Sequence, residues 1–258
     1  MSAPAGGDGA GSSGTVCFDF ADPETGVAAL VRTNLGAGSA DAHGLLLTAD
    51  GESIGMDGVR VSDDGERASV SMETDGAGLE AELTRLAGAA LEPGSAFSDA
   101  AGLTEEAFAA RVEGEWRAGG ASGRIECVGR VVRTSGSTDW DRVELVRSLT
   151  AALDHGSLLV VASARPAGAP GHGDEQATGV LVDPDRSLVR FDESLISTEY
   201  DPDRHPRRVG VELWSADGDA VAVRGAGTAF ASAAGTTFLR FTLDGKPGTA
   251  RYELTKAG

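Results

Sequence analysis

The chain has 258 residues, with 22 basic and 40 acidic side chains, a formal net charge of -18, 41% hydrophobic and only 5% aromatic residues. This length suits one large domain or two small ones. An acidic surface repels phosphate backbones and anionic lipid headgroups, so we expect no nucleic-acid partner and no membrane partner. The longest apolar stretches are too short to span a bilayer, which agrees with this expectation.

The N-terminus and the cysteines indicate a protein of the cytoplasm. Residues 1–14 are rich in Gly, Ala and Ser and lack the basic region and apolar core of a secretory signal, so we expect a disordered tail. Cys17 and Cys127 are far apart and outside any CxxC spacing. We therefore expect two reduced structural thiols, with no zinc site and no disulfide framework.

Turn signals recur at short intervals along the chain, and Asp-Gly pairs supply the positive φ that tight hairpin turns require. Segments with strand character lie between the turns, at 143–153, 158–164, 209–214, 220–224 and 238–243. The turn signals are Ala49-Asp50-Gly51, Asp63-Asp64-Gly65, Asp75-Gly76, Asp154-His155-Gly156, Asp183-Pro184-Asp185, Asp217-Gly218 and Asp244-Gly245. This pattern predicts an antiparallel all-β protein.

Two segments depart from strand periodicity. In 79–91 and 103–112 apolar residues fall three and four apart, and Thr104 can cap a helix start that Glu105 and Glu106 follow. We expect one or two short helices there. Because the stretch 91–123 is rich in Gly and Ala, we predict an N-terminal β lobe with a helical connection over 15–123 and a C-terminal β lobe over 124–258.

No metal, nucleotide or hydrolase motif is present in the sequence. The four histidines, His43, His155, His172 and His205, show neither HxH nor HExxH spacing. There is no GxSxG elbow, and Gly225-Ala226-Gly227 is too short to be a phosphate loop. We therefore expect no cofactor and no metal.

The densest polar cluster beside an aromatic residue lies at 133–142. Trp140 can form a wall of a ligand pocket while Asp139 accepts a hydrogen bond or a proton, since desolvation beside an aromatic wall raises the pKa of a carboxyl. Arg133 can polarise a carbonyl or bind an acidic substrate, and Glu126 is a further proton donor. Alternatively, this segment is a corner in which Asp139 caps backbone amides and Trp140 belongs to the core.

A few other large residues can line a cavity. Trp116, Trp214 and Tyr200 are the candidates for substrate contacts, although most aromatic residues belong to cores. The segment 200–206 contains two prolines and mixed charge. It is either a surface loop or a lid over one end of a barrel.

The order of these features resembles the lipocalin-like hydroxyneurosporene synthase (carotenoid hydratase) superfamily, from about Phe18 to Leu254. The characteristic stretch of that family is of the type His-Ser-Trp-Gly-x-Arg-Asp-Trp. Residues 133–140 match it at Gly136, Asp139 and Trp140 and lack its His, its first Trp and its Arg. The other similar segments are Phe18-Asp19-Phe20-Ala21-Asp22 with Gly26, Asp41-Ala42-His43-Gly44, 123–132, Leu153-Asp154-His155-Gly156, Gly179-Val180-Leu181-Val182-Asp183 and Thr198-Glu199-Tyr200-Asp201.

The resemblance implies two consecutive lipocalin/calycin-like antiparallel β-barrel or β-sandwich lobes. It also implies a cofactor-independent cyclase or isomerase, including [4+2] cycloaddition, that acts on a hydrophobic polyene or polyketide-derived small molecule of secondary metabolism. Such chemistry needs a shaped apolar cavity and one or two hydrogen-bond donors. A hydratase or dehydratase and a non-catalytic small-molecule carrier are the alternatives. The sequence is compatible with a monomer or a homodimer.

Overall fold

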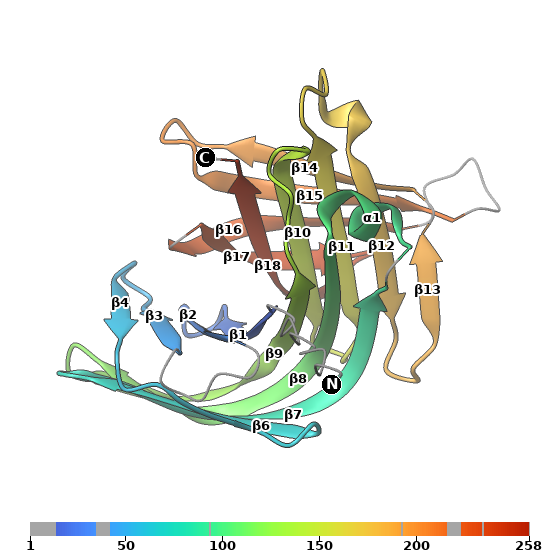
Figure 1. Cartoon of the computed structure of the whole chain (residues 1–258). Coiled ribbons are helices and arrows are strands. Elements are labelled where there is room, and N and C mark those ends of the chain that lie inside the picture. Colours follow the sequence, from blue (N-terminus) through green and yellow to red (C-terminus); the bar gives the residue numbers. More distant parts are fainter. Residues whose placement is uncertain are drawn as a thin grey trace, which may run out of the picture.

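The residues that the structure describes form two antiparallel sheets of nine strands each and one short α-helix (Figure 1). The computed structural model describes residues 14–34, 42–92, 94–191, 193–215, 223–233 and 235–257. The first sheet curls into a half-barrel and the second into a nearly closed barrel. These findings confirm the prediction of an all-β protein with two consecutive lipocalin-like lobes. In the described part of the chain no helix is long and apolar enough to cross a membrane.

In each sheet, neighbouring strands are consecutive in the chain except at one place. There the first strand of the sheet pairs with the last one. The first sheet runs β4-β3-β2-β1-β9-β8-β7-β6-β5 and the second β13-β12-β11-β10-β18-β17-β16-β15-β14. The first-sheet strands are β1 (Gly14–Asp22), β2 (Val27–Asn34), β3 (His43–Leu47), β4 (Ser53–Met56), β5 (Arg60–Asp63), β6 (Arg67–Thr74), β7 (Ala77–Leu91), β8 (Leu103–Ala118) and β9 (Ala121–Gly136). The second-sheet elements are β10 (Val143–Leu153), β11 (Leu158–Pro166), the 3-10 turn η2 (His172–Asp174), β12 (Gln176–Val182), β13 (Leu188–Phe191), β14 (Glu193–Tyr200), β15 (Pro206–Trp214), β16 (Val223–Ala233), β17 (Thr236–Leu243) and β18 (Lys246–Lys256).

The predicted Asp-Gly turns form hairpin connections in the described residues. Gly76, between β6 and β7, has φ +80°, and Gly245, between β17 and β18, has φ +79°. Because side chains with a Cβ rarely adopt this conformation, glycine at these two positions favours the turn over a continued strand. The predicted turn at Asp217-Gly218 and most of the predicted strand 220–224 lie outside the described residues.

The two predicted helical segments are strands, and that prediction is wrong. The only described α-helix, α1 (Ala96–Ala101), lies between them and has Ser95 as its N-cap. In β7 a bulge between Arg85 and Ala87 turns the buried residues after Leu86 from the core of the first lobe towards the second lobe. In β8 the buried face changes between Ala109, which packs at the junction of the sheets, and Ala110, which packs in the core of the first lobe, so the period-two alternation of the sequence shifts by one residue there.

The boundary between the sheets lies further along the chain than 123/124. Strand β9 pairs with β1 and with β8, so it belongs to the first sheet, and the second sheet begins at Val143. The stretch 91–123, expected to connect the lobes, mainly supplies the long strand β8. Of the predicted tail 1–14, residues 1–13 lie outside the described residues, and Gly14 begins β1.

A core made largely of small side chains lies where the two sheets meet. It combines Ala87, Ala89, Ala107 and Ala109 of the first sheet with residues of β10, β11 and β12. Helix α1 covers one end of this junction, where Phe97 is buried and its backbone N–H donates to Thr178 Oγ1 at 3.2 Å. Because alanine brings backbones close together, the two lobes share a continuous apolar interior.

Close strand packing in the first lobe predicts a strong effect of one glycine substitution. A Cβ at Gly114 of β8 would lie 2.8 Å from Ala81 Cα and closer still to the carbonyl oxygen of Glu80. We expect Gly114→Ala to lower the free energy of unfolding by about 1–3 kcal/mol, as overpacking does. Gly55→Ala, where a Cβ meets nothing within 4 Å, is the matched control in a urea titration. Equal stabilities of the two variants would contradict the expectation.

Candidate functional site

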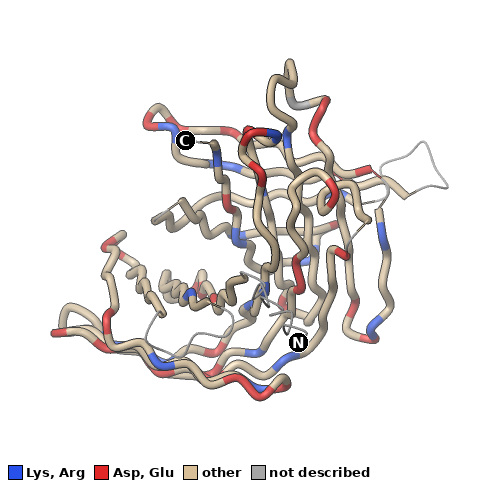
Figure 2. The backbone as a smooth tube through the Cα atoms, viewed as in Figure 1, with Lys and Arg blue, Asp and Glu red and all other residues tan. Residues whose placement is uncertain are grey.

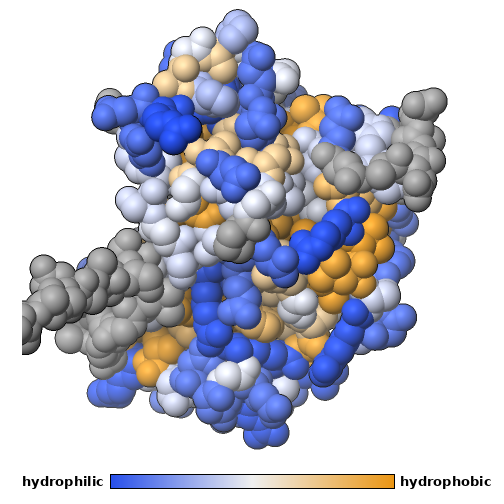
Figure 3. All heavy atoms as spheres, turned by 45° about the vertical axis from the view of Figure 1, so that its right-hand side comes forward, coloured by the Kyte–Doolittle hydropathy of each residue, from blue (hydrophilic) through white to orange (hydrophobic). Residues whose placement is uncertain are grey.

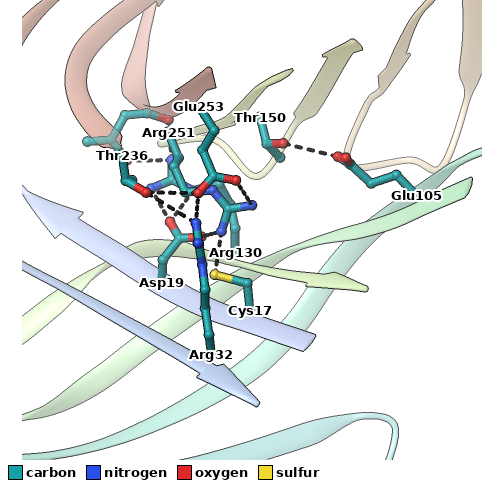
Figure 4. Close-up of polar contacts among 10 residues, drawn as sticks. Cys17, Asp19, Arg32, Glu105, Arg130, Thr150, Thr236, Arg251 and Glu253 are labelled. Carbon is teal, nitrogen blue, oxygen red and sulfur yellow. Dashed lines mark hydrogen bonds and ion pairs between the residues drawn. The ribbon is translucent and has the colours of Figure 1, made fainter. Parts of the chain in front are cut away.

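Ten polar side chains gather at the junction of the two sheets, and we call them the interlobe cluster (Figure 4). Figure 2 shows basic residues at this junction, whereas many acidic residues lie at hairpin ends. The first sheet provides Cys17 and Asp19 (β1), Arg32 (β2), Glu105 (β8) and Arg130 (β9), and the second Thr150 (β10), Thr236 (β17) and Thr249, Arg251 and Glu253 (β18).

A buried carboxylate between two arginines is the centre of the cluster. Asp19 Oδ1 accepts a hydrogen bond from Arg130 Nε at 2.6 Å, and Asp19 Oδ2 accepts one from Arg251 Nη1 at 2.6 Å. The side chains of Asp19 and Arg130 are 0% exposed, and that of Arg251 is 4% exposed. Asp19 pairs with Arg130 across β1 and β9, so strand register places both on the face that meets β18.

The edge of the cluster adds a third ion pair, between Arg32 and Glu253. Arg32 Nη2 contacts Glu253 Oε1 and donates to Thr236 Oγ1 at 3.2 Å, and Thr236 Oγ1 donates to Glu253 Oε1 at 2.8 Å. Glu253 also lies 3.6 Å from Arg251. The cluster therefore places two buried guanidinium groups, those of Arg130 and Arg251, and the partly exposed one of Arg32 at the junction of a protein whose net charge is -18.

Glu105 is the third carboxyl of the cluster, and its environment favours the neutral form. Burial raises its pKa above the ordinary glutamate value, while the positive charge of Arg251 and the hydroxyl of Thr150 act in the opposite direction. Thr150 Oγ1 lies 3.4 Å from Glu105 Oε1. A buried neutral carboxyl can donate a proton or a hydrogen bond.

A pocket of about 580 Å³ opens beside the cluster, at the seam between the sheets, and we call it the seam pocket. Thr249 belongs both to the cluster and to the pocket lining, and Arg130 Nη1 donates to its carbonyl oxygen at 2.7 Å and to its Oγ1 at 3.3 Å. The other lining residues are Ala21, Asp22, Pro23, Glu24, Leu86, Arg111, Glu126, Cys127, Val128, Asp154, His155, Gly156 and Pro184.

Both cysteines are free thiols near this site. Burial raises the pKa of Cys17 above its ordinary value, and burial together with the negative charge of Asp22 raises the pKa of Cys127 to about 12. A thiol with so high a pKa is a poor nucleophile at neutral pH. Their environments suit structural thiols, and the reduced state stays a prediction.

The structure does not bring the sequence-predicted site residues together. Asp139 and Trp140 lie in an exposed turn before β10, where Asp139 Oδ1 accepts a hydrogen bond from the backbone N–H of Asp141 at 3.1 Å. This is the capping corner considered as the alternative, except that Trp140 is 38% exposed rather than part of the core. Arg133 is bound to Asp63 at 3.0 Å and to Glu106 at 3.2 Å.

The remaining predicted residues lie at four separate places. Glu126 lines the seam pocket. Trp116 packs against the core of the first lobe, and its indole nitrogen is buried without a hydrogen-bond partner among the described residues. Tyr200 is 44% exposed at the end of β14, and Trp214 is half-buried at the end of β15. The segment after Tyr200 is a tight turn closed by a 2.9 Å hydrogen bond from Asp201 N–H to the His205 carbonyl oxygen.

The interlobe cluster was not predicted from the sequence, although the sequence carries one signal for it. Arg130 stands between Val128 and Val132 at the alternating positions of one strand, and Asp19 stands between Cys17 and Ala21 in another. A charged residue on an otherwise apolar face of a strand needs a buried partner. This signal marks the residues, but it does not identify their partners in the other lobe.

Two curled nine-stranded sheets that share an interior define a two-lobed lipocalin-like fold. Among solved structures, a protein from Nitrosomonas europaea provisionally named ATTH is similar, with TM-score 0.66 and 16% identity over 95% of this chain and 91% of that one. CghA solved with Sch210972 is also similar, with TM-score 0.61 and 12% identity over 96% of this chain and 89% of that one, and so is CghA alone. No protein-family model matches the sequence, and neither does any curated protein. At these identities the likeness shows the fold.

Proposed function

We propose that the protein is a lipocalin-like enzyme that cyclises or isomerises a hydrophobic polyene or polyketide-derived intermediate without a cofactor. The observation that carries the proposal is the seam pocket, which shares Thr249 with a buried cluster of arginines and carboxyls. The likeness of the fold to CghA, which has been solved with Sch210972, supports a small-molecule site in this architecture.

Thr249 is the group through which the cluster would act on a bound substrate. Its Oγ1 accepts a hydrogen bond from Arg130 Nη1, which leaves the hydroxyl proton available to a carbonyl of the substrate. A charged donor behind a hydroxyl strengthens the hydrogen bond that the hydroxyl donates. Polarising a carbonyl conjugated to a polyene accelerates cyclisation, provided that the pocket holds the polyene in a reactive conformer.

The seam pocket also contains side chains that can transfer protons in an isomerisation. His155 and Glu126 both line it. His155 Nε2 lies 2.7 Å from Ser157 Oγ, which donates to Asp183 Oδ1 at 2.7 Å. Since that hydroxyl donates its proton to Asp183, it can only accept from His155, so the neutral imidazole carries its proton on Nε2 and Nδ1 is the basic nitrogen. We propose chemistry at Thr249, His155 and Glu126 rather than at Asp139 and Trp140.

The test is conversion of an accumulated metabolite by the purified protein. The protein is added to extract from a source strain that lacks the gene, and products are followed by mass spectrometry. We expect a product of unchanged mass. Loss or gain of one water would instead identify a dehydratase or hydratase, and retention of a compound without conversion would identify a carrier; either result would overturn the proposal.

Replacing the polarising hydroxyl tests the site within the same assay. We expect Thr249→Val to lower turnover about a hundredfold, the usual cost of losing one donor to a developing oxyanion. Thr255→Val is the matched control, because Thr255 is exposed and lies on the same strand. Unchanged turnover in a folded Thr249→Val protein would remove Thr249 from the site.

A further inference from the structure

We propose that a second pocket on the seam, which we call the arginine pocket, binds the acidic group of the ligand. Its volume is about 660 Å³, and it lies between the ends of β7 and β8 and the β12–β13 hairpin. Leu86, the bulge residue of β7, lines both this pocket and the seam pocket. The two pockets therefore lie on either side of Leu86, and we infer that one elongated molecule spans both.

The lining of the arginine pocket combines apolar and charged side chains and is open to solvent. Figure 3 shows a hydrophobic area bordered by hydrophilic atoms on the side of the molecule that carries β12 and β13. Leu188 of β13 lines this pocket and is 43% exposed. The apolar lining residues are Leu86, Ala87, Ala89, Ala90, Phe108, Val182 and Leu188. These apolar residues can contact a hydrocarbon chain.

The charge of the arginine pocket is opposite to that of the whole protein. Its lining contains four arginines and three glutamates: Arg67, Arg85, Arg186, Arg190, Glu66, Glu92 and Glu106. Arg85 pairs with Asp63, Arg190 with Glu92, and Glu106 with Arg133. Within the described part of the chain Arg67, Arg186 and Glu66 have no ion-pair partner, so the lining keeps a net positive charge that can attract an acidic ligand.

The lining of the seam pocket carries a net negative charge, whereas that of the arginine pocket is positive. This difference orients an acidic ligand. Its lining contains four carboxylates, Asp22, Glu24, Glu126 and Asp154, against one arginine, Arg111. An anion is repelled there and attracted to the arginine pocket. The ligand class is therefore an apolar molecule with a carboxylate or a comparably acidic group at one end, with that group beside Arg186 and its polyene reaching past Leu86.

The backbone conformation of Arg186 provides a test with a matched control. Arg186 has φ +67°, in the left-handed region that favours glycine. Arg204, with φ +66°, occupies the same position of an identical Asp-Pro-Asp-Arg turn between β14 and β15. Both turns carry the same backbone hydrogen bonds, from Arg186 N–H to the Asp183 carbonyl and from Arg204 N–H to the Asp201 carbonyl. Glycine at either position should therefore stabilise its turn to the same extent. Of the two residues, Arg186 lines the arginine pocket and Arg204 does not.

The experiment measures binding of cis-parinaric acid, a polyene carboxylic acid whose fluorescence increases in apolar surroundings, and of its methyl ester. We expect the native protein to bind the acid about tenfold more tightly than the ester. Arg186→Gly should raise the melting temperature and weaken acid binding about fivefold without changing ester binding. Arg204→Gly should raise the melting temperature and leave both affinities unchanged.

Two results would overturn the inference: equal affinity of the native protein for acid and ester, or unchanged acid affinity in Arg186→Gly. The inference rests on the proposed function in treating the acid as the substrate class, yet the two fail separately. Conversion of a metabolite without acid preference would reject the arginine pocket alone. Acid preference without conversion would reject the enzyme alone.

Discussion

Asp19→Asn should destabilise the protein by about 3–5 kcal/mol, the usual cost of removing one partner of a buried ion pair. The substitution keeps the shape of the side chain but leaves Arg130 and Arg251 facing each other without the carboxylate between them. Since neither arginine is exposed to water, the two positive charges have no solvent to stabilise them. Urea unfolding followed by circular dichroism measures the loss.

An exposed ion pair of the first lobe serves as the control. Arg117 Nη2 lies 2.5 Å from Glu73 Oε1, and the two side chains are 54% and 68% exposed. Glu73→Gln should change the free energy of unfolding by at most about 0.5 kcal/mol, because water screens such pairs. A loss in Asp19→Asn no larger than that of the control would show that the cluster does not hold the lobes together.

Glu105 should make stability fall as pH rises. The unfolded chain releases this proton near pH 4.5, whereas burial raises the pKa of Glu105 in the folded protein. Between these two pKa values the folded state binds more protons than the unfolded state, so the free energy of unfolding decreases by up to about 1.4 kcal/mol per pH unit from this group. The decrease begins near pH 4.5 and ends at the folded pKa.

Glu105→Gln isolates this contribution, since glutamine keeps the shape of the neutral acid and does not titrate. The difference in free energy of unfolding, native minus variant, should fall as pH rises above about 4.5 and become constant above the folded pKa. Other titrating groups contribute equally to both proteins and cancel. A difference that grows with pH would mean that Glu105 is ionised and paired with Arg251, contrary to the effect of burial.

Hairpin structure was predictable because its determinants are local. The strand 143–153 coincides with β10, and Asp244-Gly245 forms the turn between β17 and β18. Strands β7 and β8 were not predictable in the same way. A bulge at Leu86 changes the face that β7 presents, and the buried face of β8 changes between Ala109 and Ala110, so that neither keeps a one-sided alternation.

The candidate site was less predictable than the fold. Glu126 was identified from its residue type and does line the seam pocket. Asp139 and Trp140 were chosen because they are polar and aromatic neighbours in sequence, and the structure leaves both in an exposed turn. Proximity in sequence is a poor guide to a pocket that is built from both lobes.

The sequence by itself determined the all-β class, the acidic surface and most hairpin turns, because composition, alternation and turn residues act over a few positions. Only the tertiary structure decided which charges are buried together. Asp19 meets Arg130 across 111 residues and Arg251 across 232, and no local pattern encodes either distance. Packing of one sheet on the other selects these partners, since each charge is stabilised only where the opposing strand supplies its opposite.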